Sequence, residues 1–268
     1  MTEVVLMDVE QDVALITLNR PERLNAWTGE MQVSYFDRLE QCAAREDVRA
    51  IVLTGAGRGF CAGADMDNLQ TLADGNGGRA TGGYDDRPVT FPLTIPKPIV
   101  AAINGPCAGL GLVIGLMCDI RFAATSAKLT TSFARRGLVA EHGISWILPR
   151  LVGPARALDL LLSARVVLGS EAAELGLVNR AVADADVLYE AMGYARMLAS
   201  ESSPASMAMI KRQIYADCER GLGETLSNAN RAMAESFSGR DFGEGVQSFL
   251  ERRPPNFAPL SSAQPTGG

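Results

Sequence analysis

Histidine is nearly absent from this sequence, and basic charge is outweighed by acidic charge. The 268 residues include one histidine, His142, and 25 lysine and arginine residues against 31 aspartate and glutamate residues, which gives a formal net charge of -6. One histidine cannot build a histidine–cysteine metal cluster, and it leaves a single possible member for a Ser-His-Asp triad. We therefore expect no bound metal. The acidic balance offers no basic field for a phosphate backbone, so we also expect no nucleic-acid partner.

Paired cysteines, a secretory leader and long apolar runs are lacking as well. The five cysteines are odd in number and show no paired spacing, and no leader precedes the first apolar segment. This pattern is typical of reduced thiols in a cytoplasmic protein. Glycine, aspartate or arginine interrupts every apolar stretch well short of the ~20 residues that a bilayer requires, so we expect no membrane partner.

The interior of the chain contains no proline- and serine-rich linker. With 47% hydrophobic residues, a chain of this length can bury one large core, so we expect one main α/β domain with an appendage. We place the core at residues 1–200 and a helical region at 201–257. Residues 258–268, which end in Gly-Gly, have the composition of a disordered tail. The glycine-rich stretch 73–83 is interpreted as a mobile lid or side wall, with a plain spacer as the alternative.

Two apolar strands are each followed by a glycine-rich turn. Residues 99–103 lead into Asn104-Gly105-Pro106-Cys107-Ala108-Gly109-Leu110-Gly111, and residues 48–54 lead into a similar turn that ends at Asp65. A strand, a tight turn and a helix in this order aim free backbone N–H groups at one point. Such a point suits a negatively charged oxygen, and two turns of this kind can converge on one carbonyl.

Hydrophobic periodicity predicts alternating strands and helices over the first half of the chain. Residues 4–9 and 13–18 are typical of a hairpin. Apolar residues at helical spacing from Met31 to Cys42 predict a helix, and a second helix is expected over 107–117 with its N-terminus at Gly109-Leu110. The alternation favours parallel strands with helices outside. Further helices are predicted over residues 144–151, 171–175, 187–200, 205–219, 222–236 and 243–252.

These motifs occur in an order that resembles the crotonase (enoyl-CoA hydratase/isomerase) superfamily. The resemblance runs from about residue 3 to residue 257 and rests on residues 18–21 with 25–26, 55–65, 98–105, 118–119, 137–138, 148–153, 172–178 and 249–253. It implies an α/β fold, a spiral of repeated ββα units with a C-terminal helical oligomerisation region. It also implies a homotrimer or a dimer of trimers.

The resemblance further implies an acyl-CoA thioester as substrate, with coenzyme A entering as part of that substrate and no separate cofactor. In such enzymes two backbone N–H groups bind the thioester oxygen, and motif matching assigns them to Ala64 and to Leu110, which follows Gly109. They would stabilise the enolate that forms when a proton leaves the neighbouring carbon. Loss of one such donor typically costs ~10²–10³ in rate.

The side chains that would move protons depart from the pattern of the well-known hydratases. Those enzymes carry two glutamates, and the matching positions hold Val113 and Phe133, neither of which can transfer a proton. Glu141 is available instead, at the place where double-bond isomerases of the superfamily carry a single carboxylate. Apolar neighbours would partly desolvate it, although a solvated loop glutamate remains the alternative.

Other positions acquire roles only through the resemblance. Coenzyme A would lie along Arg23, Leu24, Asn25 and Ala26, with its adenine near Ala62 and Ala64. Asp65 matches a residue that more often stabilises the turn than acts as a base. His142 would contact the substrate or Glu141, or be purely structural. Arg252 matches a basic residue that reaches a phosphate on a neighbouring subunit, or it is a solvated surface residue.

Three functions remain open from the sequence. The first is an isomerase that shifts the double bond of an enoyl-CoA, with Glu141 carrying the proton. The second is hydration of a 2-enoyl-CoA in fatty-acid β-oxidation, with Glu141 acting alone on a water molecule. The third is a non-catalytic binder of acyl-CoA or of RNA, which the acidic charge and the presence of Glu141 both disfavour.

Overall fold

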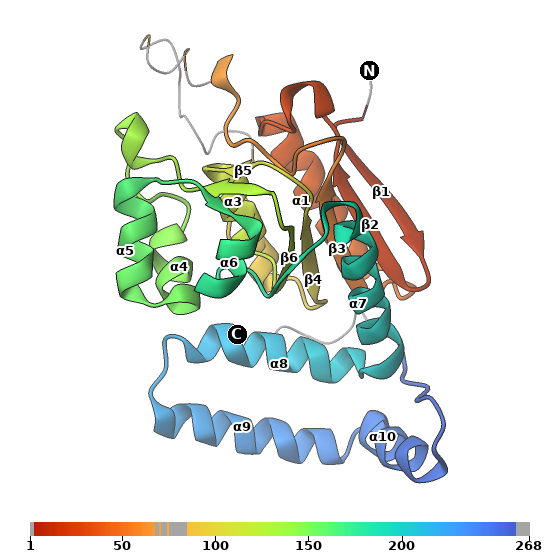
Figure 1. The fold of residues 1–268 in the computed structure, drawn as a ribbon. Helices are drawn as coiled ribbons and strands as arrows, with labels where there is room; N and C mark the ends of the chain where they lie inside the picture. Colours follow the sequence, from red (N-terminus) through yellow and green to blue (C-terminus); the bar gives the residue numbers. More distant parts are fainter. Residues whose placement is uncertain (1–2, 68–69, 71–73, 75–84, 261–268) are drawn as a thin grey trace.

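The computed structural model describes residues 3–67, 70, 74 and 85–260. Its main sheet has the strand order β1-β2-β3-β4-β6-β9, and Figure 1 shows helices around it. The strands are β1 (Val5–Glu10), β2 (Val13–Leu18), β3 (Ala50–Gly55), β4 (Ile99–Ile103), β6 (Ile120–Ala124) and β9 (Arg180–Val182). The expected hairpin of β1 and β2 is confirmed, and every later pairing in this sheet is parallel, as predicted.

The two central strands are buried on both faces. Every residue of β3 and of β4 is buried, which is why both segments read as continuous apolar runs rather than as alternating patterns. Parallel strands leave their carboxyl ends at one edge of the sheet. Both glycine-rich turns therefore begin at that edge, beside each other.

A second, three-stranded sheet joins β5 (Cys107–Ala108), β7 (Lys128–Thr130) and β8 (Val167–Leu168). Cys107 and Ala108 pair with Leu129 and Thr130 and therefore lie outside the helix predicted over 107–117, whereas its predicted N-terminus at Gly109-Leu110 is confirmed. Gly109 then adopts φ 51° and ψ -121°, a conformation that favours glycine, and helix α3 covers only Leu110–Leu116. The helix consequently begins at the amide expected to bind an anion.

Helix α1 (Gly29–Ala44) packs on the sheet with the predicted face. Its residues Met31, Tyr35, Leu39 and Cys42 are all fully buried. Three further helices follow the second sheet's strands or connect them: α4 (Ile144–Val152), α5 (Pro154–Ser163) and α6 (Gly169–Leu175). The sequence analysis did not include α5, which begins at a proline in its first turn immediately after Gly153.

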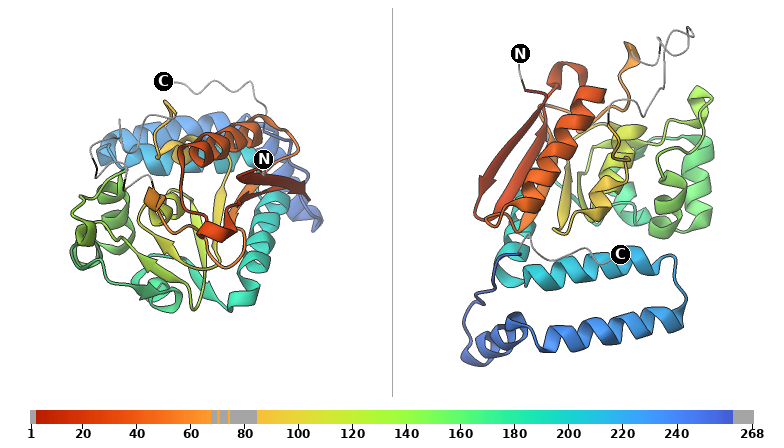
Figure 2. Two further views of the ribbon diagram at one scale, coloured as in Figure 1. Left: turned by 90° about the horizontal axis from the view of Figure 1, so that it is seen from above. Right: turned by 180° about the vertical axis from the view of Figure 1, so that it is seen from behind.

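Helix α7 (Val187–Glu201) covers the other face of the sheet. Its small residues Ala191, Ala195 and Ala199 pack in a cluster with sheet residues such as Val52 and Phe122. Beyond it lie α8 (Pro204–Asp217), α9 (Leu222–Phe237) and α10 (Arg240–Glu251). Figures 1 and 2 show α8 between the α/β body and α9, so the last two helices form an outer layer.

Asp119, the residue before β6, connects α8 to the amino-terminal ends of the central strands. One carboxylate oxygen, Oδ2, accepts hydrogen bonds from Lys211 Nζ at 2.7 Å and from the Ile99 backbone N–H at 2.8 Å. The other oxygen accepts the hydroxyl of Tyr215 at 2.9 Å. Because the side chain of Lys211 is only 8% exposed, this is a largely buried salt bridge between the sheet and α8.

The outer helical layer leaves many apolar side chains exposed within one chain. Four apolar residues of α9 are each at least half exposed: Leu222, Leu226, Met233 and Phe237. In α10, Phe249 and Leu250 are more than 70% exposed.

None of the helices described here has the length and apolarity needed to cross a bilayer. The predicted division at residue 200 falls at the end of α7. Of the predicted disordered tail, residues 261–268 lie outside the described residues, as does most of the stretch interpreted as a lid.

Candidate active site

Backbone hydrogen bonds join the two glycine-rich turns directly. The N–H groups of Phe60 and Cys61 donate to Pro106 O at 3.2 and 3.1 Å, and Ala108 N–H donates to Cys61 O at 3.0 Å. Gly105 permits this approach, because a Cβ built on it would lie 2.1 Å from Arg58 O. The predicted convergence of the two turns is therefore present in the fold.

The amides of Ala64 and Leu110 both lie at this junction. Trp27 N–H donates to Gly63 O at 2.7 Å and Asp65 N–H donates to Trp27 O at 3.0 Å. This parallel bridge leaves the N–H of Ala64 directed away from Trp27. Leu110 is the first residue of α3, where a backbone N–H has no partner inside the helix. A Cβ on Gly63 would lie 3.8 Å from Leu110 N, so the two amides come from adjoining backbone.

One pocket brings together six of the site residues predicted from the sequence, including the three expected to be catalytic. It is lined by Ala64, Gly109, Leu110, Ser132, Phe133, Arg136, Leu138, Glu141 and His142. Val113 is fully buried and does not line it. Sequence reasoning missed Ser132 and Arg136. Arg136 could have been found from its place between Phe133 and Glu141, whereas the positive φ of Ser132, 60°, has no signal in the sequence.

Glu141 and His142 form a pair at the edge of this pocket. The distance from His142 Nε2 to Glu141 Oε2 is 3.5 Å, and the side chains are 11% and 29% exposed, respectively. Burial lowers the pKa of His142, and the neighbouring carboxylate only partly opposes this effect. This shift favours the neutral form of the imidazole. His142 also has φ 57°, a backbone conformation that non-glycine residues adopt mainly at constrained sites.

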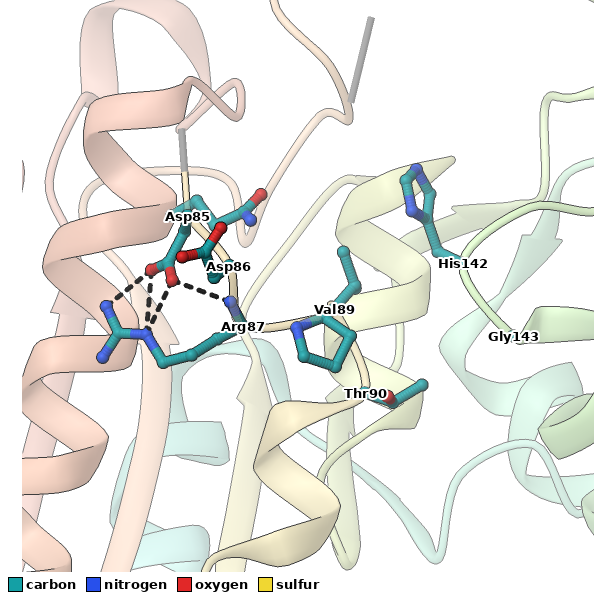
Figure 3. Close-up of a pocket in the computed structure, with 9 residues that line it drawn as sticks. Asp85, Asp86, Arg87, Val89, Thr90, His142 and Gly143 are labelled. Atoms are coloured by element: carbon teal, nitrogen blue, oxygen red, sulfur yellow. Dashed lines mark hydrogen bonds and ion pairs between the residues drawn. The ribbon is translucent and has the colours of Figure 1, made fainter. Parts of the chain in front are cut away.

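His142 also borders a second, larger cavity of about 410 Å³. The other lining residues are Gln32, Asp85, Asp86, Arg87, Pro88, Val89, Thr90 and Gly143. Figure 3 shows the segment 85–90 on one side of this cavity and His142 with Gly143 on the other. The two cavities thus share a wall at His142, one residue from the Glu141 carboxylate.

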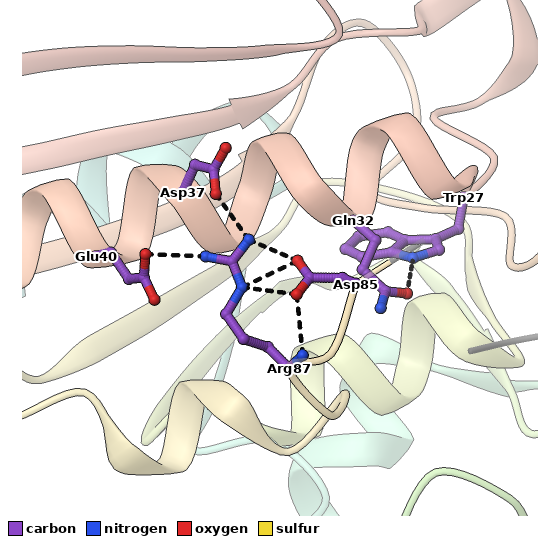
Figure 4. Close-up of polar contacts among 6 residues, drawn as sticks. All are labelled: Trp27, Gln32, Asp37, Glu40, Asp85 and Arg87. Carbon is purple, nitrogen blue, oxygen red and sulfur yellow. Dashed lines mark hydrogen bonds and ion pairs between the residues drawn. The ribbon is translucent and has the colours of Figure 1, made fainter. Parts of the chain in front are cut away.

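An arginine holds this segment in place. Arg87 Nε and Nη2 contact both carboxylate oxygens of Asp85, and its other ion pairs are with Asp37 at 2.7 Å and Glu40 at 3.0 Å, both on α1. Figure 4 shows the guanidinium between these carboxylates. The hydrogen bonds that Arg87 donates to Asp85 and Asp37, and the charges of the nearby carboxylates, raise the pKa of Arg87, which stays charged. The sequence analysis did not identify this network.

The segment expected to bind coenzyme A borders the first glycine-rich turn. Ala62 N–H donates to Leu24 O at 3.0 Å and Ala26 N–H donates to Arg23 O at 3.1 Å. The side chain of Arg23 is 54% exposed and lies 3.2 Å from Asp67. Arg23, Leu24, Ala26 and Ala62 are therefore brought together on a partly exposed rim next to Ala64, although none of them lines the pocket itself.

The Asp65 carboxylate stabilises the turn through the hydrogen bonds that it accepts. Its Oδ2 accepts from Arg20 Nη1 at 2.9 Å and its Oδ1 accepts from the Asp67 backbone N–H at 3.1 Å. Burial would raise the pKa of Asp65, but these hydrogen bonds and the charge of Arg20 outweigh burial and hold it below its usual value. The carboxylate is thus committed to the turn, and it does not line the pocket.

Arg252 is not brought to the pocket within one chain. It ends α10 with φ 55° and is exposed. Figure 1 places α10 in the outer layer, on the far side of α8 from the α/β body. As for metals, the part of the chain that the structure describes contains no group of three or more histidine, cysteine or acidic side chains able to hold an ion.

Comparison with known proteins agrees with this architecture. The family model described as Enoyl-CoA hydratase/isomerase matches residues 8–259. The chain is 36% identical to the 1,2-epoxyphenylacetyl-CoA isomerase of Escherichia coli K12, covering 96% of this chain and 99% of that protein. It is 38% identical to a probable enoyl-CoA hydratase of Rhodobacter capsulatus, covering 93% and 96%.

Solved structures show the same similarity. The enoyl-CoA hydratase EchA12_1 of Mycobacterium marinum shares 47% identity with a TM-score of 0.70, covering 82% of this chain and 100% of that one. A probable enoyl-CoA hydratase/isomerase of Mycobacterium abscessus gives a TM-score of 0.86 at 28% identity, covering 96% and 99%. The match of fold, motif order and sequence over nearly the whole chain shows that this protein belongs to the enoyl-CoA hydratase/isomerase family, the crotonase superfamily of enzymes.

Proposed function

We propose that this enzyme shifts the carbon–carbon double bond of an enoyl-CoA from C3 to C2. The observation that carries the proposal is that one pocket is lined by Ala64, Leu110 and Glu141. Two amides suited to an anion and one partly exposed carboxylate are the groups that such a reaction needs. The substrate is an acyl-CoA thioester, in keeping with the family.

The chemistry follows from these three groups. The Glu141 carboxylate takes a proton from C2 of a 3-enoyl-CoA, and the electron pair left at C2 delocalises onto the thioester oxygen. The N–H groups of Ala64 and Leu110 donate to that oxygen and stabilise the dienolate. The C2–C3 bond becomes the double bond when the protonated Glu141 returns its proton to C4. The same atoms leave as entered, so the reaction needs no water and no redox partner.

Hydration of a 2-enoyl-CoA is the alternative reaction, and the same pocket is less suited to it. Adding water across a double bond requires a positioned water molecule, and paired carboxylates hold it in the hydratases that the sequence resembles. Here the matching positions are Val113, which is fully buried, and Phe133, which is 5% exposed. Neither side chain can hydrogen-bond a water molecule. The name of the Escherichia coli relative also favours an isomerase.

Replacement of Glu141 tests the proposal. Glu141→Gln keeps the size of the side chain but removes the base, so kcat/KM for 3-octenoyl-CoA should fall by about 10²–10⁴. Glu174→Gln, at an exposed position of α6, is the matched control and should match the wild-type rate. Rates on crotonyl-CoA, a 2-enoyl-CoA, measure hydration in the same preparations. Full isomerase activity in Glu141→Gln would falsify the assignment.

We further propose that the outer helical layer joins subunits into a homotrimer or a dimer of trimers. The exposed apolar residues of α9 and α10 support this assembly, since an apolar face of that extent is normally covered. Arg252 would then bind a coenzyme A phosphate on a neighbouring subunit. Light scattering measures the mass of the assembly, and Arg252→Ala should raise KM without changing kcat. A monomer at micromolar concentration would contradict both statements.

A further inference from the structure

The turn from Glu141 to Ile144 has an unusual residue at its centre. Ile144 N–H donates to Glu141 O at 3.1 Å, which closes the turn. His142 and Gly143 occupy its two central positions with φ 57° and 80°, as in a type I′ turn. Glycine, asparagine and aspartate are the usual residues of such turns, because a Cβ at positive φ crowds the neighbouring carbonyl. The histidine at position 142 therefore carries a cost in backbone energy that glycine would avoid.

The backbone of this turn is held by its surroundings. Gly143 O accepts hydrogen bonds from Trp146 N–H at 3.0 Å and Ile147 N–H at 3.1 Å, so the turn leads directly into α4. On its other side, a Cβ built on Gly143 would lie 3.2 Å from Thr90 Cγ2. The fold thus sets the directions in which the side chains of the turn leave the backbone. A costly backbone conformation that the fold maintains points to a role for the side chain.

The polar contact that the Glu141 carboxylate makes is with the His142 ring. Nε2 of the ring lies 3.5 Å from Oε2, and no other side chain that the structure describes forms an ion pair or a hydrogen bond with this carboxylate. An ionised carboxylate can only accept, so Nε2 must carry the ring hydrogen for the contact to be attractive. The distance exceeds the about 2.7–3.2 Å of an ordinary N–H···O hydrogen bond, and contacts of this kind at active sites often shorten when substrate binds.

The charge of Glu141 acts directly on the His142 ring. It raises the pKa of His142 against the larger, opposite effect of burial. Four other charged side chains line the two cavities that His142 borders: Arg136, Asp85, Asp86 and Arg87. Neither aspartate forms an ion pair with the ring, and Asp85 is already paired with Arg87. The imidazole and the Glu141 carboxylate are therefore each other's closest charged or polar partner on this wall.

We propose that His142 is a positioning residue, whose ring holds the Glu141 carboxylate in the orientation in which it reaches C2 and C4 of the acyl chain. The inference rests on the proposed function for the role of Glu141 as the base. Nε2–H donates to one carboxylate oxygen, which leaves the other oxygen to take the substrate proton. A glutamate side chain that is 29% exposed could otherwise rotate toward water, and a small displacement of a catalytic group from its reacting atom lowers the rate steeply.

Two amide variants distinguish this role from a purely structural one. In His142→Gln the amide nitrogen can reach the place of Nε2, whereas in His142→Asn it reaches only the place of Nδ1. Positioning predicts that kcat for 3-octenoyl-CoA falls about tenfold in His142→Asn but less than about threefold in His142→Gln, with KM little changed in both. A structural role in the turn predicts the opposite order, because asparagine is favoured at positive φ and glutamine is not.

Urea unfolding of both variants keeps stability and rate apart. His142→Asn should be at least as stable as His142→Gln, for the same reason of backbone preference, and yet the slower enzyme. A kcat in His142→Asn equal to or above that of His142→Gln would overturn the inference. A rise in KM with unchanged kcat would also overturn it, since it would assign the ring to substrate binding.

A titration separates this inference from the isomerase assignment. His142 is the only histidine in the sequence, so its ring signals in an NMR spectrum are identified without further variants. Glu141→Gln removes the carboxylate charge, so the pKa of His142 should fall below its wild-type value. Glu174→Gln, at an exposed position of α6, should leave it unchanged. An unchanged titration of His142 in Glu141→Gln would overturn the inference, whether or not the enzyme isomerises 3-octenoyl-CoA.

The proton-transfer step can also be followed without isomerisation. Octanoyl-CoA has no double bond to move, but its C2 protons exchange with solvent deuterium if Glu141 removes and returns them. The exchange rate should rank His142→Gln above His142→Asn, as kcat does. That ranking would support the inference even if 3-octenoyl-CoA were not isomerised, and the reverse ranking or equal rates would refute it.

Discussion

Replacing Gly63 by alanine should disturb the fold and the chemistry together. Gly63 has φ 98°, and its added Cβ would lie 2.8 Å from Ala108 O. Its own carbonyl is held by Trp27 N–H at 2.7 Å, so the turn cannot simply move aside. Left-handed strain costs an L-residue about 1–2 kcal/mol, and forcing an extra carbon into packed structure costs about 1–3 kcal/mol. The sum predicts a loss of about 2–5 kcal/mol in the free energy of unfolding.

The catalytic effect should be larger than the stability loss alone implies. Any shift that relieves the contact with Ala108 O separates the segment of Ala64 from the start of α3, so the two amides could no longer bind one oxygen together as proposed. Loss of one such donor costs about 10²–10³ in kcat. Urea unfolding measures the stability, and the initial rate on 3-octenoyl-CoA measures the chemistry, at a temperature where the variant is folded.

Gly137→Ala is the matched control for this experiment. Gly137 also has a positive φ, 69°, but a Cβ there would meet no atom within 4 Å. It should lose only the strain contribution, about 1–2 kcal/mol, and keep most of its activity. If Gly63→Ala were as stable and as active as Gly137→Ala, the reasoning from the close approach of the two turns would be refuted.

Three other perturbations follow from charged groups. Asp119→Asn should cost about 3 kcal/mol, because it leaves the ammonium of Lys211 buried without its carboxylate; an unchanged urea midpoint would contradict this. Arg87→Gln should cost about 2–3 kcal/mol, since Asp85 loses two charge-assisted hydrogen bonds; the thermal midpoint of the variant decides. Burial lowers the pKa of His142 in the folded state, so the unfolded chain binds more protons just below pH 6.5, and stability should fall as the pH drops through that value. His142→Gln should flatten this part of the pH profile, and an NMR titration giving His142 a pKa above 6.5 would show the sign to be wrong.

The parts of the fold that could be predicted are those with a strong local signal. The face of α1 from Met31 to Cys42 and the buried strands β3 and β4 follow from periodicity and continuous apolar runs. The short strand β5 could not be predicted, because Cys107 and Ala108 are apolar residues that suit either a helix or a strand. Only the distant segment β7 decides between them.

The candidate site likewise has parts that could be predicted from the sequence and parts that could not. The approach of the two glycine-rich turns was accessible because the residues of each turn are contiguous in sequence, and the family resemblance then assigned Ala64 and Leu110 within them. The larger cavity beside His142 was not accessible, since Gln32, Asp86 and His142 come from three segments of the chain that meet only after folding. The same holds for Arg87, whose partners on α1 are about fifty positions away. Interactions between distant segments leave no periodic trace in the sequence.

The joining of the two turns by main-chain hydrogen bonds has a consequence for how such an enzyme is mapped experimentally. The proposed anion contacts at positions 64 and 110 are peptide N–H groups, which every residue except proline carries. Systematic truncation of side chains would therefore pass over both of them and report only the acid at position 141. Ester-for-amide replacement of the peptide bond, which deletes a single N–H and leaves the side chain as it was, is the chemistry that would make the hidden pair visible.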